Sequence, residues 1–313
     1  GKYHTAAIKT DGTLWMWGFN NIGQLGDNTI IHRSSPVQTI AGGTNWSSVA
    51  CGSDYVAAIK TDGTLWTWGS NYFGQLGDGT TTERLVPTEI TSQFELNEED
   101  AISLITLGRA FSLAITTEGR VFTWGRNSYG ELGDGTAIDK HVPTDTTSFF
   151  AFNPEETVIQ IASSFYHSSV ITSEGRVFMW GYNFYGQLGD GTTIDKYVPT
   201  EITSNFDLNE NETIIQVSLG EYHSIVMTSN GRILTWGSNT FGQLGIGTTT
   251  WKTSPTVVQI FVPKMFEIIM YDYNESIEYV PTRAGSIFLG WYIDQNLTIP
   301  YTSTTMPAKN LIL

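Results

Sequence analysis

The chain has 313 residues and a formal net charge of −15, and it is rich in glycine (32 residues) and tryptophan (10 residues). An acidic chain repels phosphate backbones, which argues against nucleic acid and anionic membrane as partners. The single cysteine excludes an internal disulfide, and no run of about 18 apolar residues is present that could span a bilayer. The chain starts at Gly1, inside a repeat, so we expect further sequence upstream.

One segment recurs along the chain. Trp68–Gly77 follows the pattern W-G-x-N-x-φ-G-[QE]-L-G, where φ is hydrophobic, and the other copies begin at Trp17, Trp124, Trp180 and Trp236. Successive copies are 51, 56, 56 and 56 residues apart. A period near 50 residues is typical of stacked arrays and propellers, in which each repeat is one supersecondary unit.

The second repeat predicts the elements of every unit. Tyr55–Lys60 is rich in strand formers, and Leu65–Trp68 is the returning strand. Asp62-Gly63 supplies a two-residue hairpin turn between them, because Asp-Gly tolerates positive φ. The same turn is written at Asp11-Gly12, Glu118-Gly119, Glu174-Gly175 and Asn230-Gly231. Five hairpins at one position in the period predict an all-β repeat.

Two more extended stretches complete the unit. Pro87–Ile90 follows the glycines of the motif, and proline suits the start or outer edge of a strand because no ladder donor is missed there. An apolar strand then closes the unit, at Val49–Cys51 in the first repeat and at Ile102–Leu107 in the second. We therefore expect units of four short strands, with the motif tryptophan and leucine between neighbouring sheets, which describes a propeller blade.

From the second repeat onward, an acidic loop precedes the closing strand. The loops are Phe94–Asp100, Phe152–Glu156 and Phe206–Glu212. Oxygen ligands are plentiful in them, which keeps calcium as an alternative. The ligand spacing matches no dedicated calcium loop, so solvated connections between blades are the simpler interpretation.

The pairing of G-x-x-H with W-G-x-N-x-x-G-Q-L-G resembles the regulator-of-chromosome-condensation repeat. The resemblance covers about residues 1–260 and implies a β-propeller, usually of seven blades. Five tryptophan motifs are present, and the fifth unit lacks a recognisable closing strand after Pro255–Ile260. Either further blades lie upstream or the ring closes in an unusual way. We predict an all-β fold with propeller repeats over residues 1–262.

The period stops at about Met265. Residues 281–285 (P-T-R-A-G) and 288–292 (F-L-G-W-Y) resemble the small β-grasp repeat of internalin-type bacterial surface proteins. We therefore predict an incomplete β-grasp-like module over residues 263–313. This resemblance implies a bacterial protein that is extracellular or carried on the cell surface.

Residues repeated in the blades are most simply explained by what every blade needs. His4, His167 and His223 share a position that Tyr55 and Phe111 hold in the other blades, which argues against a catalytic histidine. We interpret the three histidines as packing groups whose ring nitrogens bond to the backbone.

Four aspartates also recur, and Ile246 replaces the fifth; they are Asp27, Asp78, Asp134 and Asp190. We interpret them as turn residues that bond to nearby backbone amides, with a metal-binding ring of carboxylates as the alternative. Cys51 ends a closing strand and is interpreted as a small buried core residue. No nucleophile arrangement and no phosphate-binding glycine loop is recognisable, so we predict no enzyme, no cofactor and no metal.

Function is expected where the repeat varies, because loop positions can change without disturbing the core. The first variable set is the middle pair of the G-x-x-H loops, and the second follows the tryptophans. Aromatic residues and arginine on a polar rim are typical of contact surfaces. The predicted partner-binding residues are Tyr3, Asp54, Arg109, Phe165, Tyr166, Glu221 and Tyr222 in the first set and Tyr72, Arg126, Tyr182 and Phe184 in the second. The alternative for several of them is contact with a neighbouring blade.

The main hypothesis is a non-enzymatic, extracellular bacterial propeller that binds a protein on a host or neighbouring cell, first of all through the Phe165-Tyr166 and Glu221-Tyr222 loops. A carbohydrate-binding surface is the alternative, since exposed Tyr and Phe can stack on sugars. The resemblance also implies guanine-nucleotide exchange on a small GTPase, as in the family founder, but the acidic charge and the bacterial-looking tail argue against it. A light-sensing branch of the family uses tryptophans in the G-x-x-H loops, and none is present here.

Overall fold

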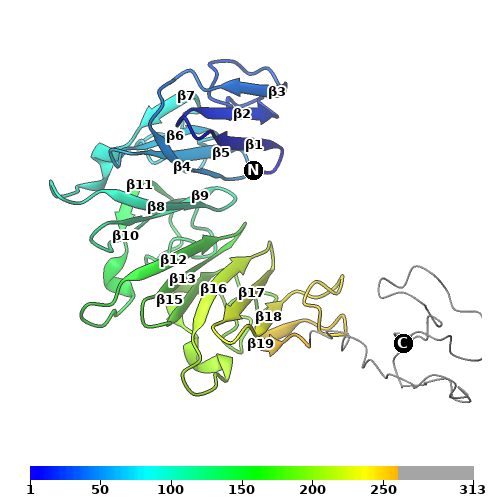
Figure 1. The fold of residues 1–313 in the computed structure, drawn as a ribbon. Coiled ribbons are helices and arrows are strands. Elements are labelled where there is room, and N and C mark those ends of the chain that lie inside the picture. The colour runs from blue at the N-terminus through cyan, green and yellow to red at the C-terminus, as the bar shows by residue number, and fades with distance from the viewer. Residues whose placement is uncertain (260–313) are drawn as a thin grey trace, which may run out of the picture. The chain divides into compact units, whose positions relative to one another are not determined.

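The structure is a computed structural model that describes residues 1–259, of which Gly1–Val258 form one compact unit. In this unit, five antiparallel sheets follow one another around an open arc (Figure 1). Four of the sheets have four strands, and the first has three. The predicted all-β fold of four-stranded units is confirmed. The predicted β-grasp-like module lies outside the described residues.

Each sheet is formed by strands that are consecutive in the chain. The first sheet holds β1 (His4–Ile8), β2 (Leu14–Gly18) and β3 (Arg33–Gln38), and the second holds β4 (Trp46–Cys51), β5 (Tyr55–Lys60), β6 (Leu65–Gly69) and β7 (Arg84–Glu89). The third holds β8 (Ile102–Leu107), β9 (Phe111–Thr116), β10 (Val121–Gly125) and β11 (Lys140–Asp145). The fourth holds β12 (Val158–Ser163), β13 (His167–Thr172), β14 (Val177–Gly181) and β15 (Lys196–Glu201). The fifth holds β16 (Ile214–Leu219), β17 (His223–Thr228), β18 (Ile233–Gly237) and β19 (Lys252–Val257).

The strand order corrects the predicted make-up of each unit. Val49–Cys51 was predicted to close the first unit, but it belongs to β4, which pairs with β5 and opens the second sheet. Short connections favour antiparallel hairpins, and the three residues between β4 and β5 form one, in which the Gly52 N–H donates to the Tyr55 carbonyl (2.9 Å). The fifth sheet is therefore complete with β16–β19 and needs no closing strand after β19.

The predicted hairpins and proline positions are confirmed, but the hairpin loop has three residues and not the predicted two. The Lys60 N–H donates to the Thr64 carbonyl and the Gly63 N–H to the Lys60 carbonyl (2.9 Å each), so Thr61, Asp62 and Gly63 form the loop, and only the glycine has a positive φ. Gly63, between β5 and β6, has a φ of 80°, and Ile59 stands opposite Leu65 across the turn. Pro87 lies in β7, an edge strand that starts at Arg84, earlier than the predicted stretch. An edge strand leaves one row of N–H groups without a ladder partner, so proline costs no hydrogen bond there.

Neighbouring sheets are joined by the motif tryptophans, as predicted. From the second sheet onward, each motif indole is fully buried and donates its N–H to a backbone carbonyl in the preceding motif. The pairs are Trp68 with Gln24 (3.1 Å), Trp124 with Gln75 (2.9 Å), Trp180 with Glu131 (2.9 Å) and Trp236 with Gln187 (2.8 Å). The same polar bond therefore recurs inside each apolar layer between sheets.

Among residues 1–259, three short 3₁₀ helices follow outer strands, namely η1 (Thr91–Phe94), η2 (Thr147–Phe149) and η3 (Thr203–Phe206). Within the described part of the chain, no helix is long and apolar enough to cross a membrane.

The acidic loops come directly after these helices, and one acid in each is buried. These acids pair with arginines of the next hairpin: Asp100 with Arg120 (3.9 Å), Glu156 with Arg176 (2.7 Å) and Glu212 with Arg232 (2.8 Å). A buried carboxylate requires such a partner, because the charge has lost its water. The interpretation of these loops as solvated connections is therefore wrong for the three paired acids.

Candidate functional site

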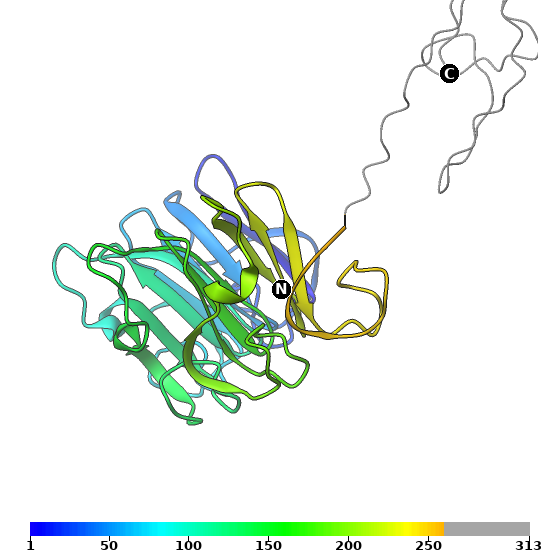
Figure 2. The same ribbon diagram turned by 90° about the horizontal axis from the view of Figure 1, so that it is seen from below.

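The two variable sets of loops emerge at the same end of the sheets. Tyr55, where β5 begins, stands opposite Gly69, where β6 ends. The equivalent pair in the fourth sheet is His167 opposite Gly181. The hairpin turns lie at the other end of these strands, so both variable sets share one surface, which we call the loop face. Figure 2 shows the segment between β18 and β19, coloured gold, projecting as a loop from the last sheet.

The loop after each tryptophan is shaped by a buried asparagine. In the second sheet, Asn71 accepts a hydrogen bond from the Leu76 N–H (3.0 Å) through its side-chain oxygen. Its amide group donates to the carbonyls of Thr80 and Thr82 (3.0 Å each). Asn71 is fully buried, while the next residue, Tyr72, is 77% exposed. The asparagine therefore holds the loop from inside and leaves its outer positions free to vary.

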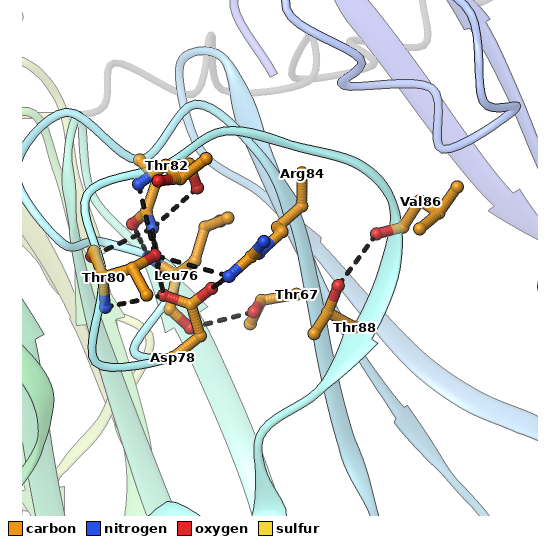
Figure 3. Close-up of polar contacts among 9 residues, drawn as sticks. Thr67, Leu76, Asp78, Thr80, Thr82, Arg84, Val86 and Thr88 are labelled. Carbon is orange, nitrogen blue, oxygen red and sulfur yellow. Dashed lines mark hydrogen bonds and ion pairs between the residues drawn. The ribbon is translucent and has the colours of Figure 1, made fainter.

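The recurring aspartate completes this arrangement (Figure 3). Asp78 Oδ1 accepts from the N–H of Thr80 (3.0 Å) and from the Asn71 amide (3.1 Å), and Oδ2 accepts from the Arg84 guanidinium (2.7 Å). The prediction that these aspartates bond to nearby backbone amides is confirmed, and Asp27, Asp134 and Asp190 make the same contact. Within residues 1–259, no group of three or more His, Cys, Asp or Glu side chains is placed to hold a metal ion.

His167 connects neighbouring blades, although not by the predicted bonds. Nδ1 of the fully buried His167 hydrogen-bonds with the Ser164 hydroxyl (2.7 Å), and Nε2 hydrogen-bonds with the Ser224 hydroxyl of the next sheet (3.0 Å). The prediction that its ring nitrogens bond to the backbone is therefore wrong, because two serine hydroxyls are closer partners. Burial lowers the pKa of His167 to about 3, so the ring is neutral at pH 7.

Aromatic rings from the loops of the third to fifth sheets form one continuous cluster on the loop face, which we call the aromatic band. Its members are Tyr129, Phe165, Tyr166, Tyr182, Phe184, Tyr185, Tyr222 and Trp251. Each ring lies 4.7–6.4 Å, centroid to centroid, from at least one other member. Tyr166 and Tyr222, from neighbouring G-x-x-H loops, stack at 5.6 Å with their planes 17° apart. Most of these contacts are edge-on or offset, the geometry that aromatic pairs prefer.

Two arginines cover rings at one end of the band. The Arg126 guanidinium lies 5.2 Å from the centroid of Tyr129 and 5.7 Å from that of Tyr166. The Arg109 guanidinium lies 5.6 Å from the Tyr166 centroid and also donates to the Tyr166 hydroxyl. A stacked guanidinium covers an aromatic face and keeps its charge, so this end of the band presents cations to its surroundings.

A buried acid accompanies Arg126. Glu131 stands where the other four motifs have glutamine; its Oε2 accepts from the Tyr129 N–H (2.7 Å), and its Oε1 lies 3.9 Å from Arg126 Nε. In the second sheet the equivalent pair is neutral, with Gln75 Nε2 donating to Ser70 Oγ (3.2 Å). Burial raises the pKa of Glu131 to about 7. The third motif has thus exchanged a Ser–Gln pair for an Arg–Glu pair, and the exchange places Arg126 in contact with the band.

The family model of the RCC1-like domain matches residues 1–291 of this sequence. The chain belongs to the RCC1-like domain family. The resemblance inferred from the tryptophan motifs is thereby confirmed for the propeller repeats. The match runs past residue 262, where we predicted the propeller to end, and the β-grasp-like module stays a prediction.

Two relatives of this RCC1-like chain span most of its length. The ultraviolet-B receptor UVR8 of Arabidopsis thaliana is 30% identical over 260 residues, which is 83% of this chain and 56% of the receptor. The E3 ubiquitin-protein ligase HERC2 of Homo sapiens is 32% identical over 261 residues, which is 83% of this chain and 5% of the ligase. The chain therefore spans about half, or much less, of the length of these relatives.

Solved structures support the propeller architecture. Human WBSCR16 superposes with a TM-score of 0.71 at 26% identity, over 83% of this chain and 66% of that one. Yeast RCC1 (Prp20), solved bound to Kap60, superposes with a TM-score of 0.69 at 19% identity, over 86% of this chain and 62% of that one. The second likeness concerns the fold alone.

Most of the predicted contact residues gather at the aromatic band. Phe165, Tyr166, Tyr182, Phe184 and Tyr222 are members of it, Arg109 and Arg126 cover it, and Glu221 adjoins Tyr222. Tyr72 contacts Phe73 (4.9 Å), a ring that Arg126 also covers. Tyr3 and Asp54 belong to loops of the first two sheets and take no part in the band; Tyr3 contacts Phe19 (6.0 Å) instead. The prediction of these residues as a binding site stays a prediction.

Three members of the band were missed by the sequence analysis. Tyr129 and Tyr185 occupy the φ position of the motif, which was interpreted as part of the repeated framework. Ile22 at the same position shows that the framework requires only a hydrophobic side chain. The tyrosines could therefore have been recognised from the sequence as candidate contact residues. Trp251 lies outside the motif, in the loop directly before β19, and no periodic pattern points to it.

The G-x-x-H loops also surround a hollow of about 330 Å³ at the centre of the arc. Residues that end the first strand of successive sheets line it, including Cys51, Leu107, Ser163 and Leu219. Cys51 was predicted to be buried core, but it is half-buried, because the end of β4 faces this hollow. The hollow adjoins the band through Phe165.

Proposed function

We propose that this chain is a non-enzymatic protein-binding propeller whose contact surface is the aromatic band. The observation that carries the proposal is that one continuous aromatic surface is built from positions that vary between blades. Two of its rings are well exposed, Phe184 at 54% and Trp251 at 45%. Tyrosine, tryptophan and arginine contribute most to binding at protein interfaces, because they bury large areas and retain polar groups. The band and the two arginines that cover it combine all three residue types.

Site-specific crosslinking tests this proposal. A photo-reactive phenylalanine analogue replaces Phe184 in the full protein, which is then incubated with surface extracts of host and neighbouring cells. The matched control carries the analogue at Tyr3, which is 62% exposed on the loop face of the first sheet. We expect one saturable protein adduct from position 184 that is absent from position 3 and lost in Trp251→Glu. Equal adducts from both positions would place the partner elsewhere.

A carbohydrate partner is the second candidate, and exposed rings favour it. Tyr72 and Phe184 offer open faces on which a sugar ring can stack. A glycan array separates the two candidates: saturable retention of a glycan, lost in Phe184→Ala, together with no protein adduct, would favour the carbohydrate-binding surface.

We also propose that the chain works outside a bacterial cell or on its surface, towards partners on other cells. The support is the resemblance of residues 281–292 to internalin-type surface proteins. Protease treatment of intact producing cells tests this location. Degradation of the full protein while cytoplasmic proteins stay intact is the expected result, and complete protection of the chain would overturn it.

A further inference from the structure

The two ends of the aromatic band differ in how their ring faces are covered. At one end, Arg109 and Arg126 stack on Tyr129 and Tyr166. The other end consists of Tyr182, Phe184, Tyr185, Tyr222 and Trp251, which we call the open cluster. Among residues 1–259, no lysine or arginine lies over a ring of the open cluster. Guanidinium groups of the described residues therefore cover ring faces at one end of the band, and none of them covers a ring of the open cluster.

The rings of the open cluster are close enough together to hold a planar group. Tyr185 lies 5.2 Å from Tyr222 and 5.4 Å from Trp251, centroid to centroid, and Phe184 lies 6.2 Å from Trp251. Tyr182 and Phe184 are nearly parallel, with their planes 11° apart at 6.4 Å. Several of these rings meet at 57–63°, so part of their electron-rich faces is not covered by another ring of the cluster.

Carboxylates border the open cluster. Glu221 is exposed beside Tyr222, and burial together with the neighbouring Glu221 carboxylate raises the pKa of the Tyr222 hydroxyl. Asp195 accepts the N–H of Asn183 (2.7 Å), directly after Tyr182 in the chain. In the part of the chain that the structure describes, neither carboxylate forms an ion pair with a lysine or arginine. This border, on a chain of net charge −15, attracts a cation.

We infer that the open cluster binds an arginine side chain of the partner protein, so that the partner completes the ring–guanidinium stack that Arg109 and Arg126 make within the chain. This inference rests on the proposed function, because it names the chemistry of the partner at the same surface. Guanidinium is planar and more weakly hydrated than the ammonium of lysine, so less hydration is lost when it stacks on a ring face. Glu221 and the tyrosine hydroxyls supply acceptors for its N–H donors, as the Tyr166 hydroxyl does for Arg109.

Fluorine NMR of the full protein labelled with 5-fluorotryptophan tests the inference, since Trp251 reports on the open cluster. Trp251→Phe assigns the resonance, and the probes are the N-acetyl amides of arginine, lysine and citrulline. Citrulline matches arginine in shape but carries no charge. We expect a saturable shift with arginine, at least fivefold weaker apparent affinity with lysine, and no saturable shift with citrulline.

Variants locate the site and separate it from folding defects. Tyr222→Ala and Glu221→Gln are expected to weaken arginine binding at least threefold, and Tyr3→Ala to leave it unchanged. Should Tyr222→Ala unfold, Phe184→Ala serves instead, because that ring is 54% exposed. Equal shifts with citrulline, or full binding by Tyr222→Ala and Phe184→Ala, would overturn the inference.

The two proposals fail in distinguishable ways. If position 184 crosslinks a protein and the arginine amide neither binds nor competes with it, the band is the contact surface and the arginine inference is wrong. If the arginine amide binds the open cluster and no protein crosslinks there, the cation site stands and the protein-binding proposal is wrong.

Discussion

Two groups of side chains share the loops that follow the tryptophans. The asparagines of the motif are fully buried in all five sheets, and each accepts a hydrogen bond from the N–H of its motif leucine. The residues directly before them vary in size and charge, namely Phe19, Ser70, Arg126, Tyr182 and Ser238. The comparison shows that constancy in this repeat marks the loop framework and that variation marks its surface. Substitutions in the two groups should therefore have opposite effects on stability and binding.

The largest expected effect comes from removing the framework under the band. Asn183→Ala leaves the Leu188 N–H and the carbonyls of Thr192 and Ile194 without the partners they have at 2.9, 3.2 and 3.1 Å. Unsatisfied buried groups of this kind should lower the free energy of unfolding by about 3 kcal/mol in urea denaturation. The exposed Asn21 is the matched control, and Asn21→Ala should cost less than about 0.5 kcal/mol. A loss below about 1 kcal/mol in Asn183→Ala would contradict the framework role.

Glu131, the buried acid of the third motif, should make the free energy of unfolding depend on pH. Its pKa is about 7 in the folded chain against an ordinary value of 4.5, so the folded state keeps a proton that the unfolded state releases between these two values. Stability therefore falls as the pH rises from 4.5 to 7 and is level above that window. Relative to Glu131→Gln, the wild type should lose about 3 kcal/mol between pH 4.5 and pH 8 in urea denaturation.

The matched control for that titration restores the neutral pair of the second blade. The double variant Arg126→Ser, Glu131→Gln copies Ser70 and Gln75, so it should show the same pH profile as Glu131→Gln. Parallel profiles for the wild type and both variants would mean that Glu131 does not titrate in this window.

A smaller loss is expected at the junction between sheets. Trp180→Phe removes the indole N–H that donates to the Glu131 carbonyl (2.9 Å) and leaves space in a fully buried layer. We expect a loss of about 1.5 kcal/mol, measured by urea denaturation. Trp15→Phe is the control, since the half-buried Trp15 bonds only to Thr13 in its own hairpin, and it should cost less than half as much. Equal losses would show that the bond between sheets contributes nothing specific.

The smallest effect on stability should come from the surface group. Phe184→Ala truncates a ring that is 54% exposed, so the free energy of unfolding should change by less than about 0.5 kcal/mol. Binding measured by crosslinking or by the arginine probe should nevertheless weaken. A loss of more than about 1.5 kcal/mol would identify Phe184 as a packing residue and remove it from the contact surface.

Part of the candidate site could be predicted from the sequence. Tyr166, Tyr182 and Tyr222 were predicted because they occupy loop positions that differ between the repeats and at which the fold requires no particular side chain. Tyr185 was not predicted because it occupies the hydrophobic position of the motif. The fold requires a hydrophobic residue there, and a tyrosine satisfies that requirement without indicating a binding role. Trp251 could not be predicted, because nothing in the period says which side chains of a long loop turn towards the neighbouring blade.

The sequence by itself determined the strands, the positions of the hairpins at Gly63 and its equivalents, and the aspartate contacts of the loops. These features depend on residues a few positions apart, so a local pattern repeated five times is enough to identify them. Only the tertiary structure decided that β4 opens the second sheet and that the rings of three sheets join into one band with a cation-filled and an open end. Strand pairing and ring contacts of this kind join different blades, and their geometry is set by how the sheets pack on one another.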